Sequence, residues 1–151
     1  MQTACSVAPS SAQSDTDQVI SSMRRLLDAY AANNPDAVID VIDRERFTLF
    51  GSDVSEIVRS ETELRSMMRD DFALWRTAAF GEMRDQSVWV DDSVATQMFH
   101  VGLSVGGRAE VLIRVTAVWH KRAGTWKLVQ SSNTVPTVGS SARELLQRGP
   151  R

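Results

Sequence analysis

The hydrophobic pattern of the chain changes its period once, near Gly81, and this change constrains the fold more than any other feature. Before Gly81, apolar residues recur at the spacing of three or four residues that is typical of helices. After Gly81 they alternate in runs separated by turn residues, as strands do. Helices followed by consecutive strands predict an α+β domain, in which helices are segregated to one side of an antiparallel sheet.

Three helices are predicted before this change. The first spans about residues 15–32, with Ser14-Asp15 as its cap. Asn34-Pro35-Asp36 predicts the start of a short second helix, because Asn caps a helix and Pro suits its first turn. Ser60-Glu61-Thr62-Glu63 fits a capping box and begins a third helix. Its mainly apolar stripe comprises Leu64, Met67, Met68, Asp71, Phe72 and Trp75.

Five strands are expected, at residues 47–50, 87–90, 94–105, 108–120 and 125–134. Gly106-Gly107 predicts a two-residue hairpin, because glycine permits the positive φ angles of such turns. This turn would place His100 opposite Ile113 and Met98 opposite Val115 on one face of the sheet. Phe99 would then lie opposite Arg114 on the other face.

The register of the last hairpin stays open. A two-residue loop at Ala123-Gly124 would put Trp119 on the same face as Trp126 and Leu128. A three-residue loop would instead put Trp119 with Lys127, Val129, Ser131 and Asn133. One residue of register moves every side chain to the other face, and the residues alone do not decide between the two.

The chain is expected to form one domain at residues 15–138, between a flexible N-terminal arm at 1–14 and a tail at 139–151 with a weak helix at 142–147. The net charge is -2 and no stripe of Lys and Arg is present, so nucleic acid is not an expected partner. No apolar run approaches the roughly 20 residues that cross a bilayer, and no signal peptide is indicated. The expectation is therefore a cytoplasmic protein without a membrane partner.

The ligands for a metal or a disulfide framework are also missing from the sequence. Cys5 is the one cysteine, and the two histidines, His100 and His120, have no metal-binding spacing. Gly102, Gly106 and Gly107 fit strands and turns and do not form a phosphate-binding loop. We expect no metal and no cofactor.

Two stretches resemble the nuclear-transport-factor-2-like superfamily. They are residues 46–51, Arg-Phe-Thr-Leu-Phe-Gly, and residues 116–126, which follow the pattern Thr-x-Val-Trp-His-x-x-x-Gly-x-Trp. The chain is most similar to the SnoaL-like and calmodulin-dependent-kinase-II association-domain-like group, over about residues 15–137. The resemblance implies a cone-shaped, curved antiparallel (mixed) sheet wrapped around the three N-terminal helices, the cystatin-like roll, with a pocket at the mouth of the cone.

The resemblance also implies what the pocket lacks. The association domains carry arginines there, and the matching positions are His100, Ala117 and Asn133, so a neutral pocket is expected. These three share a face only with the three-residue loop, so the resemblance favours that register. Ketosteroid isomerases, which are similar in fold, need a carboxylate and a tyrosine at positions that fall near Phe50 and Leu26. Their chemistry is therefore not expected.

The predicted pocket is formed by side chains from the third helix and from four of the strands. They are Phe50, Trp75, Met98, His100, Trp119 and Asn133. Apolar walls with a few polar groups predict a small, neutral or weakly polar, ring-containing ligand. The preferred hypothesis is a small-molecule-binding, self-associating domain without catalysis. The alternative is an isomerase, cyclase or dehydratase that acts on a hydrophobic cyclic substrate, with His100 as the catalytic acid or base.

Self-association is predicted through the outer face of the sheet. In the favoured register this face carries Phe99, Val101, Leu112, Val118, Trp126 and Leu128. A monomer seldom exposes so much contiguous apolar surface, so we expect a homodimer in which two sheets pair face to face.

Overall fold

The structure, a computed structural model, describes residues 13–148. The predicted arm, residues 1–14, therefore lies almost entirely outside the described residues. Four helices are present, α1 (Asp15–Ala31), α2 (Pro35–Ile39), α3 (Glu61–Leu74) and α4 (Ala142–Arg148). The strands are β1 (Thr48–Phe50), β2 (Ile57–Val58), β3 (Ala78–Phe80), β4 (Arg84–Asp91), β5 (Val94–Val105), β6 (Val111–Arg122) and β7 (Thr125–Thr134).

The first three helices begin where the capping residues predict. The Ser14 and Asn34 side chains accept hydrogen bonds from backbone N–H groups three residues later, at 3.1 Å in both cases. At α3, Ser60 Oγ accepts from Glu63 N at 3.2 Å, and Glu63 Oε2 accepts in turn from Arg59 N. These bonds satisfy N–H groups that the first turn of a helix leaves free.

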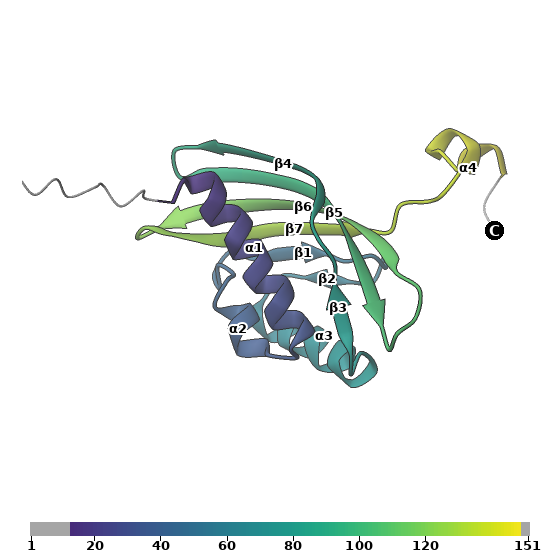
Figure 1. The fold of residues 1–151 in the computed structure, drawn as a ribbon, viewed down its shortest axis with the longest axis horizontal. Coiled ribbons are helices and arrows are strands. Elements are labelled where there is room, and N and C mark those ends of the chain that lie inside the picture. The colour runs from purple at the N-terminus through teal and green to yellow at the C-terminus, as the bar shows by residue number, and fades with distance from the viewer. Residues whose placement is uncertain (1–12, 149–151) are drawn as a thin grey trace, which may run out of the picture.

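The seven strands form one curved sheet in the order β2-β1-β7-β6-β5-β3, with β4 also paired to β5. β1 runs parallel to β7 and the other pairs are antiparallel, so the sheet is mixed, as predicted. Helix α1 lies across the concave face, α2 and α3 lie at one end, and α4 projects away from the body (Figure 1). The sequence analysis did not predict the short strands β2 and β3.

The register between β5 and β6 differs from the prediction by one residue. The two-residue turn itself is confirmed, because Gly106 and Gly107 have φ of +59° and +71° and Arg108 N donates to Val105 O at 3.1 Å. However, His100 pairs with Arg114, not with Ile113. Residues 108–110 lie between the turn and β6. Beyond the last pair, Leu103 with Val111, three residues follow the turn but only two precede it, and this difference shifts the register by one residue.

This shift places two predicted pocket residues on the outer face. Met98 and His100 lie outside, whereas Phe99 pairs with the buried Val115 and faces the helices. The prediction for β6 was right, since Ile113, Val115 and Ala117 do face inward. Of these two strands, only β5 was assigned the wrong way round.

The last hairpin combines the two alternatives. Its loop has two residues, with Arg122 paired to Thr125. A β-bulge then leaves Val129 without a partner, because Trp119 pairs with Leu128 while Val118 pairs with Gln130. Trp119 therefore shares the concave face both with Trp126 and Leu128 and with the later residues Ser131 and Asn133.

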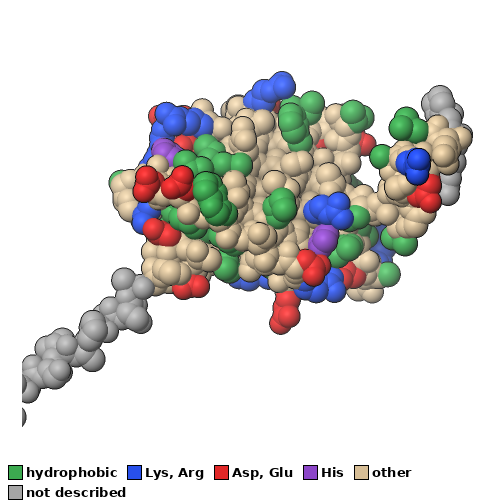
Figure 2. Space-filling model, turned by 90° about the horizontal axis from the view of Figure 1, so that it is seen from above, with side chains coloured by type: hydrophobic (Ala, Val, Ile, Leu, Met, Phe, Trp, Pro, Cys, Tyr) green, Lys and Arg blue, Asp and Glu red, His purple; other side chains and the backbone are tan. Residues whose placement is uncertain are grey.

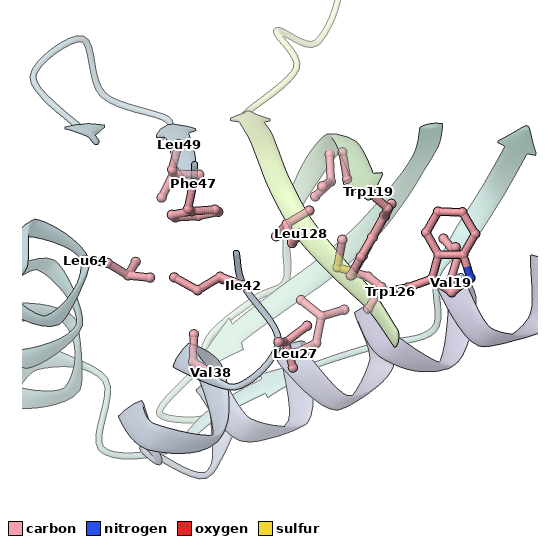
Figure 3. Close-up of a cluster of buried hydrophobic side chains, with 14 of the residues drawn as sticks. Val19, Leu27, Val38, Ile42, Phe47, Leu49, Leu64, Trp119, Trp126 and Leu128 are labelled. Carbon is pink, nitrogen blue, oxygen red and sulfur yellow. The ribbon is translucent and has the colours of Figure 1, made fainter. Parts of the chain in front are cut away.

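The core lies between the concave face and the helices (Figure 3). Trp119 and Trp126 extend from β6 and β7 towards Val19 of α1, and both rings are fully buried. Phe99, Val101, Trp126 and Leu128 are each at most 2% exposed. The prediction that these four lie on the outer face is therefore wrong, whereas Leu112 and Val118 do lie there.

Candidate functional site

One end of the cone holds a cavity of about 160 Å³ between the concave face and helices α1 and α3. Its walls are mainly apolar, with Leu26 and Leu27 from α1, Met67 from α3, Val101 from β5 and Ile113 from β6. Leu49 of β1 and Leu64 of α3 also line it, and both point towards the interior in Figure 3. The cavity is thus built from elements that are far apart in the sequence.

Two of the six predicted pocket residues line this cavity. Trp75, which ends α3, and Asn133 of β7 are in its wall. Phe50 is 49% exposed, because strand alternation turns its neighbour Leu49 inward instead. Met98 and His100 lie on the outer face.

Trp119 lies on the predicted face but outside the cavity. Ile113 and Val115 line the cavity, whereas Ala117 and Trp119, further along β6, are 0% exposed and are not part of its wall. The indole Nε1 of Trp119 donates to Gln97 Oε1 at 3.2 Å, so this buried polar group is satisfied. Packed side chains therefore fill this end of the cone.

The polar groups of the cavity come from four parts of the fold, namely α1, the loop between β1 and β2, α3 and β7. They are Tyr30, Ser52, Glu56, Asp71, Ser131 and Asn133. Within the described part of the chain, no Lys, Arg or His lines the cavity. The prediction of a neutral pocket is therefore wrong, because two carboxyl groups face it without a basic side chain in the wall.

Tyr30 and Asp71 form a hydrogen-bonded pair inside the cavity, in which the tyrosine hydroxyl donates to Asp71 Oδ2. Aromatic rings hold Tyr30 in place. Phe72 packs edge-on against it with ring centroids 5.0 Å apart, and Trp75 and Phe80 follow at 6.2 and 6.4 Å. The pair joins the C-terminal ends of α1 and α3.

Both members of the pair have raised pKa values. Burial raises the pKa of Asp71, the hydrogen bond from Tyr30 lowers it, and the charges of Glu56 and Asp70 raise it further. Burial, the bond to Asp71 and the nearby Glu56 all raise the pKa of Tyr30. Tyr30 therefore stays a hydrogen-bond donor at neutral pH. Asp71 is a carboxyl group in an environment that disfavours its charge, as is typical of proton-transfer and ligand-binding groups.

Glu56 lies at the edge of the cavity, in the loop between β1 and β2. Its Oε2 accepts hydrogen bonds from Asp53 N at 3.0 Å and from Ser52 Oγ at 3.4 Å. A Cβ atom at Gly51 would lie 2.2 Å from the same oxygen. The absence of a side chain at Gly51 therefore leaves room for the carboxyl group of Glu56.

His100 belongs to a polar cluster on the outer face. Its Nδ1 lies 2.8 Å from Asp85 Oδ2, and its Nε2 accepts from Arg114 Nε at 3.0 Å. These contacts satisfy both ring nitrogens and give Arg114 a partner. The imidazole is outside the cavity, so the geometry offers it no role on a molecule bound there.

The sequence contains a signal for the Tyr30–Asp71 pair, but the sequence analysis did not identify the pair from it. Asp71 occupies a position of α3 where the helical period calls for an apolar side chain, and Tyr30 ends the apolar stripe of α1. An acid on a core-facing stripe is unusual, since buried carboxyl groups need a partner.

The described residues contain neither a cluster of metal ligands nor a membrane-spanning helix. Residues 13–148 contain no group of three or more His, Cys, Asp or Glu side chains that could hold a metal ion. No helix among them is long and apolar enough to cross a membrane.

The curved mixed sheet, the enclosed helices and the cavity define a cystatin-like α+β roll. The SnoaL-like domain family matches residues 19–137, which is most of the chain. The chain belongs to this family. Among curated proteins, none matches the sequence significantly.

Solved structures with this fold are numerous but distant in sequence. A candidate dehydratase of the NTF2-like family from Streptomyces avermitilis has a TM-score of 0.73 at 13% identity, covering 82% of this chain and 98% of that one. A candidate calcium/calmodulin-dependent protein kinase II association domain from Xanthomonas campestris has 0.69 at 18%, covering 91% and 99%. A protein of unknown function with a cystatin-like fold from Nostoc punctiforme has 0.71 at 12%, covering 83% and 95%. At these identities the similarity establishes the fold alone.

Proposed function

We propose that the protein binds a small, mainly apolar, ring-containing molecule in the cone cavity, with the Tyr30–Asp71 pair as its polar anchor. The observation that carries this proposal is the mainly apolar cavity with the hydrogen-bonded Tyr30–Asp71 pair in its wall. Such sites bind through apolar area and select through a few oriented polar groups. An apolar cavity of about 150 Å³ accepts benzene, so about 160 Å³ suits one six-membered ring with a short substituent.

This proposal keeps the ring-containing ligand of the sequence analysis and changes its polar contacts. The expectation of a neutral or weakly polar ligand rested on a neutral wall, and Glu56 and Asp71 remove that basis. The catalytic alternative rested on His100, which lies on the outer face. If proton transfer does occur in the cavity, Asp71 and Tyr30 are placed to perform it and His100 is not.

A pair of tryptophan variants tests the site. Ile113→Trp places an indole in the cavity wall, and we expect it to weaken the binding of benzyl alcohol at least about tenfold, equivalent to about 1.4 kcal/mol. Leu112→Trp is the matched control, because it adds the same ring one residue away on the outer face. Isothermal titration calorimetry gives the affinities, and thermal unfolding checks that both variants fold. Equal affinities in the two variants would count against the cavity as the binding site.

The second part of the proposal is a homodimer formed through the outer face of the sheet. Trp89, Val94 and Met98 support it, because these exposed apolar residues lie together on β4 and β5, where Trp89 pairs with Thr96. On the face shown in Figure 2, hydrophobic side chains form several groups separated by polar ones. The patch is thus smaller than the sequence predicted.

We expect sedimentation to give a dimer at tens of micromolar protein, a concentration that a specific interface of ordinary size tolerates. Met98→Glu should shift the protein to a monomer, because it places a charge within the apolar patch. Gln130→Glu is the control for added charge on this face, because Gln130 is exposed on β7, two strands away from β5. A monomeric wild-type protein under these conditions would exclude the dimer.

A further inference from the structure

We propose that the ligand carries a protonated amine, held in the cavity by the carboxylates of Asp71 and Glu56 and by the neighbouring aromatic rings. The inference rests on the proposed function, and it names the chemical class of the molecule that the cavity binds. The inference follows from the carboxyl groups and aromatic rings that line this mainly apolar cavity.

The charge in the wall has one sign. Asp71 comes from α3 and Glu56 from the loop between β1 and β2, so two separate elements direct carboxyl groups to the same space. Neither acid forms an ion pair with a Lys or Arg among residues 13–148. Both carboxyl groups are partly buried and accept hydrogen bonds, but neither has a counter-charge, so a cation in the cavity would be attracted by both of them.

The aromatic side chains of the wall favour the same charge. Tyr30, Trp75 and Phe80 all line the cavity, and the Trp75 and Phe80 centroids lie 6.2 and 6.4 Å from that of Tyr30. The faces of aromatic rings attract cations within about 6 Å of the centroid. An ammonium group beside Asp71 would therefore meet both a carboxylate and aromatic faces, while the apolar body of the ligand contacts leucine and methionine side chains.

An organic cation suits this site better than a metal ion. Calcium requires six to eight oxygen ligands, and Asp71 and Glu56 are the two carboxyl groups in the described wall. The rest of the wall is mostly apolar, so it offers few ligands to a metal ion. It would instead stabilise the carbon skeleton of an amine by removing apolar surface from water. An anionic ligand would meet two negative charges and no basic side chain.

Three probes of the same shape and different charge test the inference. Benzylamine is cationic, benzyl alcohol is neutral and benzoate is anionic at pH 7. We expect wild-type protein to bind benzylamine about tenfold more tightly than benzyl alcohol, the size of effect that a hydrogen bond to a charged group produces. Benzoate should bind more weakly than the alcohol. Calorimetric titration at fixed, low salt gives the three dissociation constants.

The double variant Asp71→Asn/Glu56→Gln tests the residues. It should bring benzylamine and benzyl alcohol to within about twofold of each other, because the amides keep the shape and remove the charge. Asp91→Asn/Glu82→Gln is the matched control, because it removes the same charge from two exposed acids outside the cavity wall and should keep the preference.

Each outcome distinguishes the inference from the proposed function. If benzyl alcohol binds as tightly as benzylamine to wild-type protein, the inference is overturned and the cavity remains a binding site. An unchanged preference in Asp71→Asn/Glu56→Gln overturns the assignment of the carboxylates. Failure of all three probes to bind overturns both the inference and the proposed function. The wild-type comparison needs no variant, so it stands even if the double variant does not fold.

Discussion

Phe99→Ala is expected to lower the free energy of unfolding by about 3–5 kcal/mol, the range found when a buried phenylalanine is truncated in a core. Phe99 is 2% exposed and faces the helices from the middle of β5. Its removal takes the ring out of apolar surroundings and leaves a cavity beside the buried Val115 and Val101. Typical domains are stable by about 5–15 kcal/mol, so this loss would be a large part of the total.

Met98→Ala is the matched control for this prediction. Met98 is adjacent in sequence but 53% exposed on the outer face, so its truncation should change the stability of the monomer by no more than about 0.5 kcal/mol. Because Met98 also lies in the proposed dimer patch, both variants are compared at a protein concentration at which sedimentation gives a monomer. Urea unfolding followed by tryptophan fluorescence measures both variants. If Met98→Ala were the more damaging of the two, β5 would be paired in the register that the two-residue hairpin predicts by itself.

Much of the fold could be predicted, because its signals are local. Capping side chains specify where α1, α2 and α3 begin, and glycines mark the turns that follow β5 and β6. The register could not be predicted, because it depends on single extra residues that local patterns do not reveal. Residues 108–110 beyond the first turn and Val129 in the β7 bulge each change which side chains share a face.

These two irregularities explain the outcome for the candidate site. The extra residue after Gly107 turns His100 and Met98 outward, and the bulge brings Asn133 to the same face as Trp119. The hydrogen-bonded pair in the cavity was missed for another reason. Tyr30 and Asp71 meet only because α1 and α3 pack with their C-terminal ends together, and no spacing within one helix can reveal that contact.

The three positions at which the association domains carry arginines have different environments here. His100 lies outside the cone, Ala117 is buried beyond the cavity, and Asn133 lines the cavity. The arginine-free pocket therefore results from two causes. At position 133, the neutral amide of Asn133 lines the cavity where the association domains have an arginine. At position 117, packed side chains fill the space that an arginine would need.

The structure therefore predicts a large effect for Ala117→Arg. Ala117 is 0% exposed, and its strand partners on the concave face are Gln97 and Ser131, neither of which carries a charge. Gln97 already uses its amide for hydrogen bonds with Trp119 and Gln86, so a guanidinium there would lack partners. An unpaired buried charge costs about 3–5 kcal/mol, and overpacking of a filled core adds about 1–3 kcal/mol.

We expect Ala117→Arg to lose about 4 kcal/mol or more of stability by these two effects, or to yield no folded protein. Thr116→Arg is the control, because it adds the same side chain one residue earlier on the exposed outer face and should stay within about 0.5 kcal/mol of wild type. Thermal and urea unfolding measure both. A well-folded Ala117→Arg protein with near-normal stability would mean that the cavity extends along β6 as far as Trp119, and that this end of the cone is open to a ligand.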